Sequence, residues 1–213
     1  SPARAAPRSL STAETIRAAG GRCDFFPVDV RKEISMRSAF ENIGARTDHL
    51  NTLIYSAGIL RGQYSAVADL EVEDWEATID TNLKGTYLAT KYAAPLLIRA
   101  ETSVVLLISS GAGVRGGSSS LAYAASKAGM HGMQYNLERD LPGARLHVVC
   151  PGSIATPLKL KNIGQSAVAQ GNDPEAAIET ARKSLGDPMG VARVLAYLAS
   201  DEADYVRGTV FTR

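Results

Sequence analysis

The sequence predicts an α/β protein built on a doubly wound parallel sheet, in three layers with helices on both faces. Helical and strand patterns alternate along almost the whole chain, and the crossovers are long enough to join parallel strands. The β-branched and leucine run over 104–108 is typical of a strand buried on both faces. Since crossovers are right-handed and ligands bind at the carboxyl ends of such strands, function is expected in the turns after them.

Periodicity and turn residues place the individual elements. Strands are expected over five short apolar runs, at 23–28, 50–55, 104–108, 145–149 and 208–212. Helices are expected over 11–19 with Ser11 as N-cap, and over 33–43, 123–140, 174–185 and 189–199. A long helical stretch over 72–100 is expected to bend or break near Asn82. The polar segment 157–174 is expected to be irregular and mobile.

Composition limits the class of protein. A chain of 213 residues fits a single domain over 1–213, and 45% hydrophobic residues suffice for a core. The net charge is +1 with no basic tract, which argues against nucleic-acid binding. The sequence contains no run of about 18 apolar residues, so it does not predict a membrane span. Residues 1–10 lack the apolar core of a signal peptide, and the missing initiator Met suggests an upstream start.

The cysteines and histidines suggest neither a disulfide framework nor a metal centre. Cys23 and Cys150 each lie beside a predicted strand, so two buried thiols are expected, with a disulfide as the alternative. Free thiols favour a reducing, cytoplasmic setting. His131 and His147 have no neighbouring ligand residues of metal-site spacing, so no metal is expected.

Tyr123 and Lys127 carry the strongest chemical signal. They are four residues apart and therefore share one helix face. An ammonium near a phenol favours the phenolate, which lowers a tyrosine pKa from its reference of about 10 toward the working pH. Such a phenol can act as general acid or base, and a neighbouring serine hydroxyl can hold a carbonyl oxygen.

Three segments in order resemble the short-chain dehydrogenase/reductase family, namely 107–110, 123–127 and 149–156. The likeness continues in 26–30, 80–85 and 198–208, and so covers nearly the whole chain. It implies one Rossmann-type domain that binds a dinucleotide and catalyses hydride transfer between an alcohol and a ketone or aldehyde.

The resemblance also implies catalytic roles. Tyr123 would donate or accept the proton, and Ser110 would hold the substrate oxygen. Lys127 would lower the tyrosine pKa and bind the nicotinamide ribose, while Asn82 would hold a water linking Lys127 to solvent. Ser109 is interpreted as structural, and Asn82 could alternatively cap a helix at the break.

Cofactor contacts follow from the same resemblance. Besides Tyr123 and Lys127, the implied residues are Asp29 and Val30 near the adenine, Ala57 and Gly58 along the cofactor, and Pro151, Gly152, Ile154 and Thr156 at the nicotinamide. Asp29 could instead cap the helix near Arg31. The choice between NAD and NADP stays open, with Arg4 and Arg8 favouring NADP faintly.

The chain departs from the family pattern in two places. The glycine-rich turn that places the pyrophosphate at a helix N-terminus is absent, as if about 40 residues of a first βαβ portion were missing. Either the sequence is a piece of a complete enzyme, or the chain is a cofactor-poor, non-catalytic binding or scaffold subunit that pairs with a homologue. In addition, Tyr55 and Ser56 stand where the family commonly has two asparagines.

Substrate and assembly are less constrained. Residues 157–187 are expected to form a substrate loop or lid, and their polarity suggests a small polar alcohol or carbonyl compound, with an acyl-carrier oxo-ester also open. Small residues over 122–132 let that helix approach a neighbour closely, which fits the dimers or tetramers that the resemblance implies.

Overall fold

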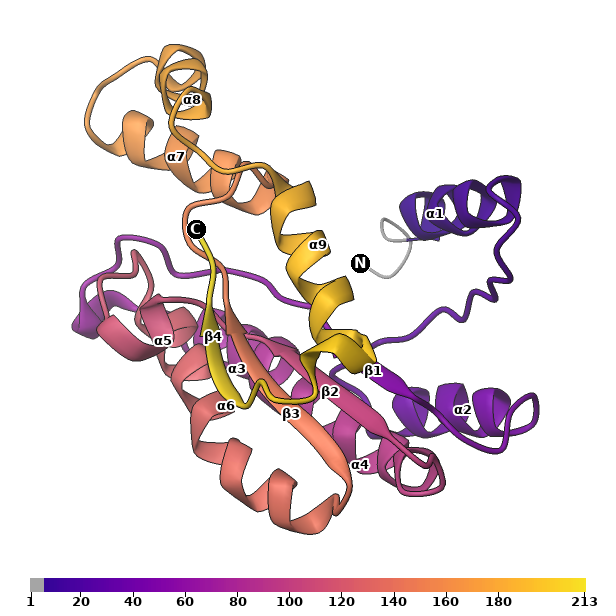
Figure 1. The fold of residues 1–213 in the computed structure, drawn as a ribbon. Coiled ribbons are helices and arrows are strands. Elements are labelled where there is room, and N and C mark those ends of the chain that lie inside the picture. The colour runs from indigo at the N-terminus through magenta and orange to yellow at the C-terminus, as the bar shows by residue number, and fades with distance from the viewer. Residues whose placement is uncertain (1–5) are drawn as a thin grey trace.

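A four-stranded parallel sheet forms the centre of the computed structural model, which describes residues 6–213 (Figure 1). Its strands are β1 (Thr52–Tyr55), β2 (Ser103–Ile108), β3 (Ala144–Cys150) and β4 (Gly208–Phe211), in the order β1-β2-β3-β4. Leu53 pairs with Val105, and Val149 pairs with Val210. All three ladders are parallel, which confirms the predicted sheet type.

Nine α-helices connect or flank the strands of this described part. They are α1 (Ala6–Ala18), α2 (Glu33–Gly44), α3 (Val72–Ile79), α4 (Gly85–Leu97), α5 (Ala112–Arg115), α6 (Leu121–Asp140), α7 (Pro157–Ala169), α8 (Pro174–Arg182) and α9 (Pro188–Ala199). Short 3₁₀ turns cover Val67–Asp69 and Asp201–Ala203. Over residues 6–213, none of the helices combines the length and the apolar character that crossing a membrane requires.

Two hydrophobic cores, one on each face of the sheet, explain the three layers. Successive side chains of a strand point to opposite faces. Val105 and Leu107 of β2 therefore join the core beneath α2, α4 and α6, whereas Val104 and Leu106 join the core beneath α9. β3 divides its side chains in the same way, with Val148 in the first core and Val149 in the second. Every valine, leucine and isoleucine of β2 and β3 thus packs in one of the two cores, as the continuous apolar run predicted for β2.

The break expected near Asn82 is present as a π-helical turn over Asp80–Lys84 between α3 and α4. The amide of Gly85 donates to the carbonyl of Asp80, five residues back. Wider turns of this kind leave backbone groups without their usual helical partner and are frequent at functional sites.

The strand expected over 23–28 is not formed. These residues run as extended chain between α1 and α2, and no described strand pairs with them. A strand is defined by its ladder, so an apolar run without a partner stays irregular. Side-chain contacts hold it instead: Arg46 forms an ion pair with Asp24 and lies over the ring of Phe26.

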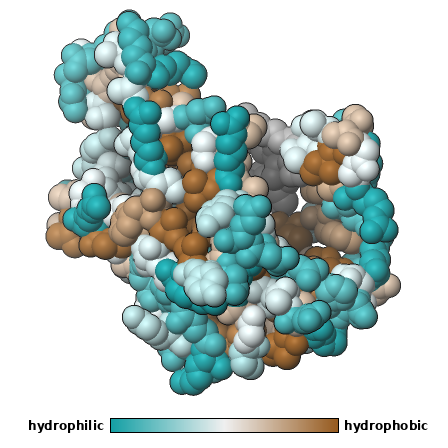
Figure 2. Space-filling view, viewed as in Figure 1, coloured by the Kyte–Doolittle hydropathy of each residue, from teal (hydrophilic) through white to brown (hydrophobic). Residues whose placement is uncertain are grey.

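The prediction of an irregular segment over 157–174 is also wrong, because most of these residues form α7. Thr156 caps the helix by accepting a hydrogen bond from the Lys159 amide, and Pro157 occupies the first turn, where proline is favoured. Gly164 and Ala167 are buried, and Gly164 faces Ile178 of α8. Figure 2 shows that the outer surface of the α7–α8 projection is mostly hydrophilic, which explains why composition alone concealed the helix.

A smaller difference concerns the first helix. It begins at Ala6 rather than near Ser11, so Ser11 lies inside α1 and is not its N-cap. Pro7 falls in the first turn, where its missing N–H leaves no helical hydrogen bond unmade. The predicted start therefore placed a boundary inside a continuous helix.

Candidate active site

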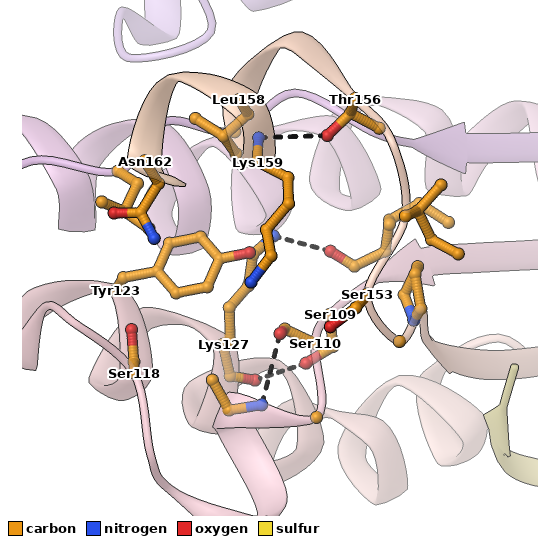
Figure 3. Close-up of a pocket in the computed structure, with 18 of the residues that line it drawn as sticks. Ser109, Ser110, Ser118, Tyr123, Lys127, Ser153, Thr156, Leu158, Lys159 and Asn162 are labelled. Carbon is orange, nitrogen blue, oxygen red and sulfur yellow. Dashed lines mark hydrogen bonds between the residues drawn. The ribbon is translucent and has the colours of Figure 1, made fainter. Parts of the chain in front are cut away.

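A cavity of about 530 Å³ opens at the carboxyl ends of β1, β2 and β3. The turns after these strands supply Gly58, Ser110 and Gly152, the start of α6 supplies Tyr123, and α7 closes one side (Figure 3). The cavity therefore lies where ligands bind in doubly wound sheets. Tyr123, Ser110 and Lys127 all line the cavity. The fold thus brings Ser110, from the turn after β2, close to two residues of α6.

Ser120 fixes the position of Tyr123. It is buried at the start of α6, where its hydroxyl accepts a hydrogen bond from the Tyr123 amide at 3.2 Å. The same hydroxyl donates to the carbonyl of Arg61 at 2.6 Å. The N-cap thus anchors the first turn of α6 to the loop after β1, and the phenol is presented from a fixed helix terminus.

Lys127 lies one turn further along α6 and is buried. Its Nζ donates to the carbonyl of Ile108 at 2.7 Å and lies 5.7 Å from the centroid of the Tyr123 ring. Burial lowers the pKa of Lys127 to about 8, although the neighbouring Cys150 thiol opposes this shift. A buried lysine with a pKa near 8 can exchange a proton at physiological pH.

The pKa of Tyr123 moves in the opposite direction from the one expected. Burial raises it above its ordinary value, and nearby Ser110 offsets only part of the rise. Lys127 does not contribute to this shift, and its Nζ donates to the carbonyl of Ile108. In the site as it stands, the phenol is therefore protonated at neutral pH and is ready to act as an acid.

Ser109 and Ser110 have different surroundings. The hydroxyl of Ser109 is buried, donates to the carbonyl of Lys127 at 2.9 Å and lies 3.1 Å from His131 Nε2. Ser110 instead faces the cavity, where its hydroxyl accepts from the amide of Ala112 at 3.2 Å. Ser109 thus braces α6 against β2, and Ser110 is the serine available to a ligand.

Asn82 lies behind the cavity in the π-helical turn and is fully buried. Its side chain accepts from the amide of Ile59 at 2.8 Å and donates to the carbonyl of Ile59 at 2.9 Å. It also donates to Ser126, whose hydroxyl bonds the Tyr123 carbonyl. The side chain does not cap a helix, so that alternative is wrong. It instead ties the loop after β1 to α6.

The predicted cofactor residues fall into two groups. The residues beside the cavity are Gly58, Pro151, Gly152, Ile154 and Thr156, together with Tyr123 and Lys127. They fit a nicotinamide riboside: the bare Gly58 backbone lies against Lys127, since a Cβ there would be 3.6 Å from Nζ. The remaining residues, Asp29, Val30 and Ala57, do not line the cavity.

Asp29 is engaged by its own loop. Its carboxylate accepts from the amide of Arg31 at 3.1 Å and forms an ion pair with the Arg31 guanidinium at 2.8 Å. This partner lowers the pKa of Asp29 to about 2. Asp29 therefore orders the approach to α2 but does not cap it, because the N-cap position is Lys32, and the capping alternative is wrong. Val30 and Ala57 pack against the first core.

The cavity also contains residues that no motif identified. Gly116 and Gly117 both adopt positive φ and carry the loop before α6 around its rim. From α7 come Lys159 and Asn162, which were anticipated only as polar residues of a lid. The Thr-Pro pair before them was the available signal, because it marks a helix start soon after the turn that follows β3.

Both cysteines are free thiols. Cys150 is buried at the end of β3, with Sγ 3.6 Å from His131 Nε2, while Cys23 is half-buried outside the sheet. Two free thiols are confirmed and the disulfide alternative is wrong, but only Cys150 is buried as predicted, whereas Cys23 is half-buried.

Comparisons with known proteins agree with this fold. The family described as enoyl-(acyl carrier protein) reductase matches residues 4–212. The 3-oxoacyl-[acyl-carrier-protein] reductase of Thermotoga maritima is 32% identical over 197 residues, covering 89% of this chain and 75% of that protein. Human (3R)-3-hydroxyacyl-CoA dehydrogenase is 34% identical over 188 residues, covering 86% and 69%.

Solved structures show the same architecture. The aldohexose dehydrogenase of Thermoplasma acidophilum superposes with a TM-score of 0.75 at 28% identity, covering 86% of this chain and 74% of that one. Levodione reductase superposes with a TM-score of 0.84 at 23% identity, covering 95% and 80%, and supports the fold alone. The chain belongs to the short-chain dehydrogenase/reductase family, a class of oxidoreductases.

Proposed function

We propose that this protein interconverts an alcohol and a ketone or aldehyde by NAD(P)-dependent hydride transfer, with Tyr123 as general acid and base. The observation that carries the proposal is the meeting of Tyr123, Lys127 and Ser110 in one cavity at the carboxyl ends of the strands. Each residue supplies a different requirement of the reaction: a proton, a route for its replacement and a hydrogen bond to the reacting oxygen.

The residues act as follows in the direction of reduction. NAD(P)H, when bound, supplies the hydride to the carbonyl carbon. The Ser110 hydroxyl donates a hydrogen bond to the carbonyl oxygen, and the Tyr123 phenol transfers its proton to that oxygen as negative charge develops. The raised pKa of Tyr123 suits this role, because the phenol holds its proton until the oxygen becomes basic enough to take it.

Lys127 assists through its position beside the phenol. Its pKa of about 8 means that it is mostly protonated at pH 7 and can still give up a proton without a large cost. With a cofactor bound, Lys127 would hold a ribose hydroxyl, and its charge would stabilise the tyrosinate that remains after proton transfer. Asn82 keeps the loop after β1 and α6 aligned, and a water held near its turn would reprotonate Lys127.

The finer assignments are part of the same proposal. Arg4 and Arg8 favour NADP, but Arg4 lies outside the described residues and Arg8 lies within α1. A homo-oligomer, dimer or tetramer, is supported by Leu121 and Tyr135 of α6 and Tyr87 of α4, which are exposed at 50%, 81% and 49%. The two free thiols are consistent with a cytoplasmic protein. The names of the similar proteins indicate different substrates, which are acyl-carrier, acyl-CoA and sugar compounds. The carbonyl substrate of this protein is therefore to be identified by assay.

Replacing the phenol tests the proposal. Tyr123→Phe should abolish reduction of a carbonyl panel by NADH and NADPH, while thermal unfolding and NAD(P)H binding stay near wild type. Tyr135→Phe, on the exposed side of the same helix, is the matched control and should keep full activity. Near-normal rates in Tyr123→Phe would refute the mechanism. Failure of the wild type to bind either dinucleotide at millimolar concentration would favour the non-catalytic scaffold subunit instead.

A further inference from the structure

Two residues of α7 form a group of hydrogen-bond donors on the side of the cavity that the reaction does not use. Lys159 and Asn162 are three positions apart and therefore share one face of the helix. Both line the cavity, and Figure 3 shows both side chains extending toward Tyr123. They are placed to meet a substrate rather than to stabilise the helix.

The charge of Lys159 is not neutralised by the surrounding residues. The cavity lining contains no aspartate or glutamate among the described residues, and its two charged side chains are Lys127 and Lys159. Lys127 already donates to a carbonyl, whereas no described carboxylate lies within ion-pair distance of Lys159. Lys159 also stands in the first turn of α7, where the helix dipole disfavours a cation. An anion bound in the cavity would compensate this arrangement.

Asn162 adds a second, oriented donor. Its side-chain oxygen accepts a hydrogen bond from the Ser119 hydroxyl at 3.0 Å. This bond leaves the amide nitrogen, which only donates, free to face the cavity, and Figure 3 shows it on the side toward Tyr123. The carbonyl of Asn162 is contacted by the Tyr64 hydroxyl at 3.5 Å. Ser119 therefore holds the side-chain amide of Asn162, while Tyr64 contacts its backbone carbonyl.

The shape of the site limits the size of the ligand. Lys159 and Asn162 also line a second cavity of about 290 Å³, between α7, α8 and Tyr64, so they mark the boundary between the two spaces. A group bound at this boundary shares the 530 Å³ cavity with Tyr123 and the nicotinamide end of the cofactor. The bound group and the reacting carbonyl must therefore lie in one cavity, which favours a short ligand over a long-chain one.

We propose that Lys159 and Asn162 bind the carboxylate of a short oxo acid or hydroxy acid, which is the substrate of the reaction at Tyr123. The proposal rests on the function proposed above. One ammonium and one amide match a single carboxylate, whereas a phosphate is more often held by several cations or by arginine. During reduction the hydride reaches the carbonyl carbon, the proton of Tyr123 reaches its oxygen, and the carboxylate is unchanged.

Matched substrates separate the role of the carboxylate from that of the carbonyl. The purified protein is assayed with NADPH and NADH on short 2-oxo and 3-oxo acids and on the methyl esters of the same acids. The wild type should prefer the acids. Lys159→Met should raise KM for the acids about 10- to 100-fold with little change in kcat, as expected for a lost charge-assisted hydrogen bond. Its KM for the esters should stay within about twofold.

Three further variants make the test specific. Lys161→Met, at an exposed position of α7 outside both cavities, should behave as wild type. Lys159→Arg retains a carboxylate-binding cation and should recover most of the acid activity. Asn162→Asp can still accept from Ser119 but replaces the donor by a negative charge, so it should raise KM for the acids far more than KM for the esters.

The outcomes distinguish this inference from the proposed function. Equal effects of Lys159→Met on acids and esters would overturn it, as would a preference of the wild type for esters or acyl thioesters over free acids. A matching loss of NAD(P)H affinity, measured by fluorescence titration, would assign Lys159 to the cofactor phosphates and would also overturn it. If the wild type reduces neither acids nor esters nor any other carbonyl, the proposed function itself has failed.

Discussion

The hydroxyl of Tyr55, at the end of β1, donates a hydrogen bond of 2.6 Å to the carbonyl of Thr81 in the π-helical turn. Tyr55 is buried, and the desolvation raises the pKa of its phenol, so the group stays protonated and can only donate to this acceptor. Tyr55 thereby ties the end of β1 to the π-helical turn. The substitution that distinguishes this chain from the common family motif is therefore a brace for the turn that holds Asn82.

Removing this hydroxyl should weaken the turn. Tyr55→Phe removes the hydrogen bond to the buried carbonyl of Thr81, which costs about 0.5–1.5 kcal/mol of unfolding free energy. We also expect kcat to fall, because the turn carries Asn82 and its contacts to Ile59 and Ser126. Urea unfolding and steady-state kinetics measure the two effects. Tyr87→Phe, half exposed on α4, is the control and should change neither.

Gly85 should be coupled energetically to Tyr55. Its backbone is ordinary α-helix, with φ of −61°, so it is needed for space rather than for conformation. A Cβ there would overlap the Tyr55 hydroxyl and lie 3.1 Å from the ring carbon that bears it. Gly85→Ala should therefore destabilise by about 1–3 kcal/mol, although alanine is the better helix former.

A double-mutant cycle checks the source of that cost. In the Tyr55→Phe background the overlapping oxygen is gone, so Gly85→Ala should cost at least about 1 kcal/mol less than in the wild type. Additive effects of the two substitutions would show that the glycine is required for some reason other than contact with Tyr55.

Lys127 should make stability depend on pH in the alkaline range. Burial lowers its pKa to about 8, below the ordinary lysine value of 10.5, so the unfolded chain binds more protons between these two pH values. The contribution of Lys127 therefore improves as pH rises from 8 to 10.5. Relative to Lys127→Met, the wild type should gain about 2–3 kcal/mol of unfolding free energy between pH 7 and pH 10. Lys161→Met, at an exposed position, should show no such difference; a flat comparison for Lys127→Met would mean that its charge is well solvated.

Local patterns predicted the sheet, most helices and the break at Asn82, because each leaves a periodic or motif signal within a few residues. Their failures have a shared cause. Residues 23–28 have strand composition, but a strand also needs a partner that the described chain does not offer. The α7 helix has a polar surface, and its buried side is visible only when Gly164 meets Ile178 of α8.

The candidate site shows the same division. The spacing of Tyr123 and Lys127 predicted that they share a helix face, and they do line one cavity. Spacing carries no information about burial, and it is burial that raises the pKa of Tyr123 where a lowering was expected. Asn82 and Ile59 lie 23 residues apart, so no local pattern could indicate that the asparagine side chain holds that loop.

The side chain of His147 is buried in β3, outside the candidate active site. Its relative exposure is 0%, and neither ring nitrogen has a hydrogen-bond partner. Burial lowers its pKa below the ordinary 6.5, so the unfolded chain takes up a proton that the folded chain excludes. Stability should therefore fall as pH drops below about 6.5. His147→Leu removes both the unsatisfied nitrogens and the proton uptake; we expect a gain of about 1–3 kcal/mol at pH 8 and a larger gain at pH 5. Urea unfolding at the two pH values measures it, with exposed His49→Leu as control. An equal gain at both pH values would show that His147 does not titrate on unfolding.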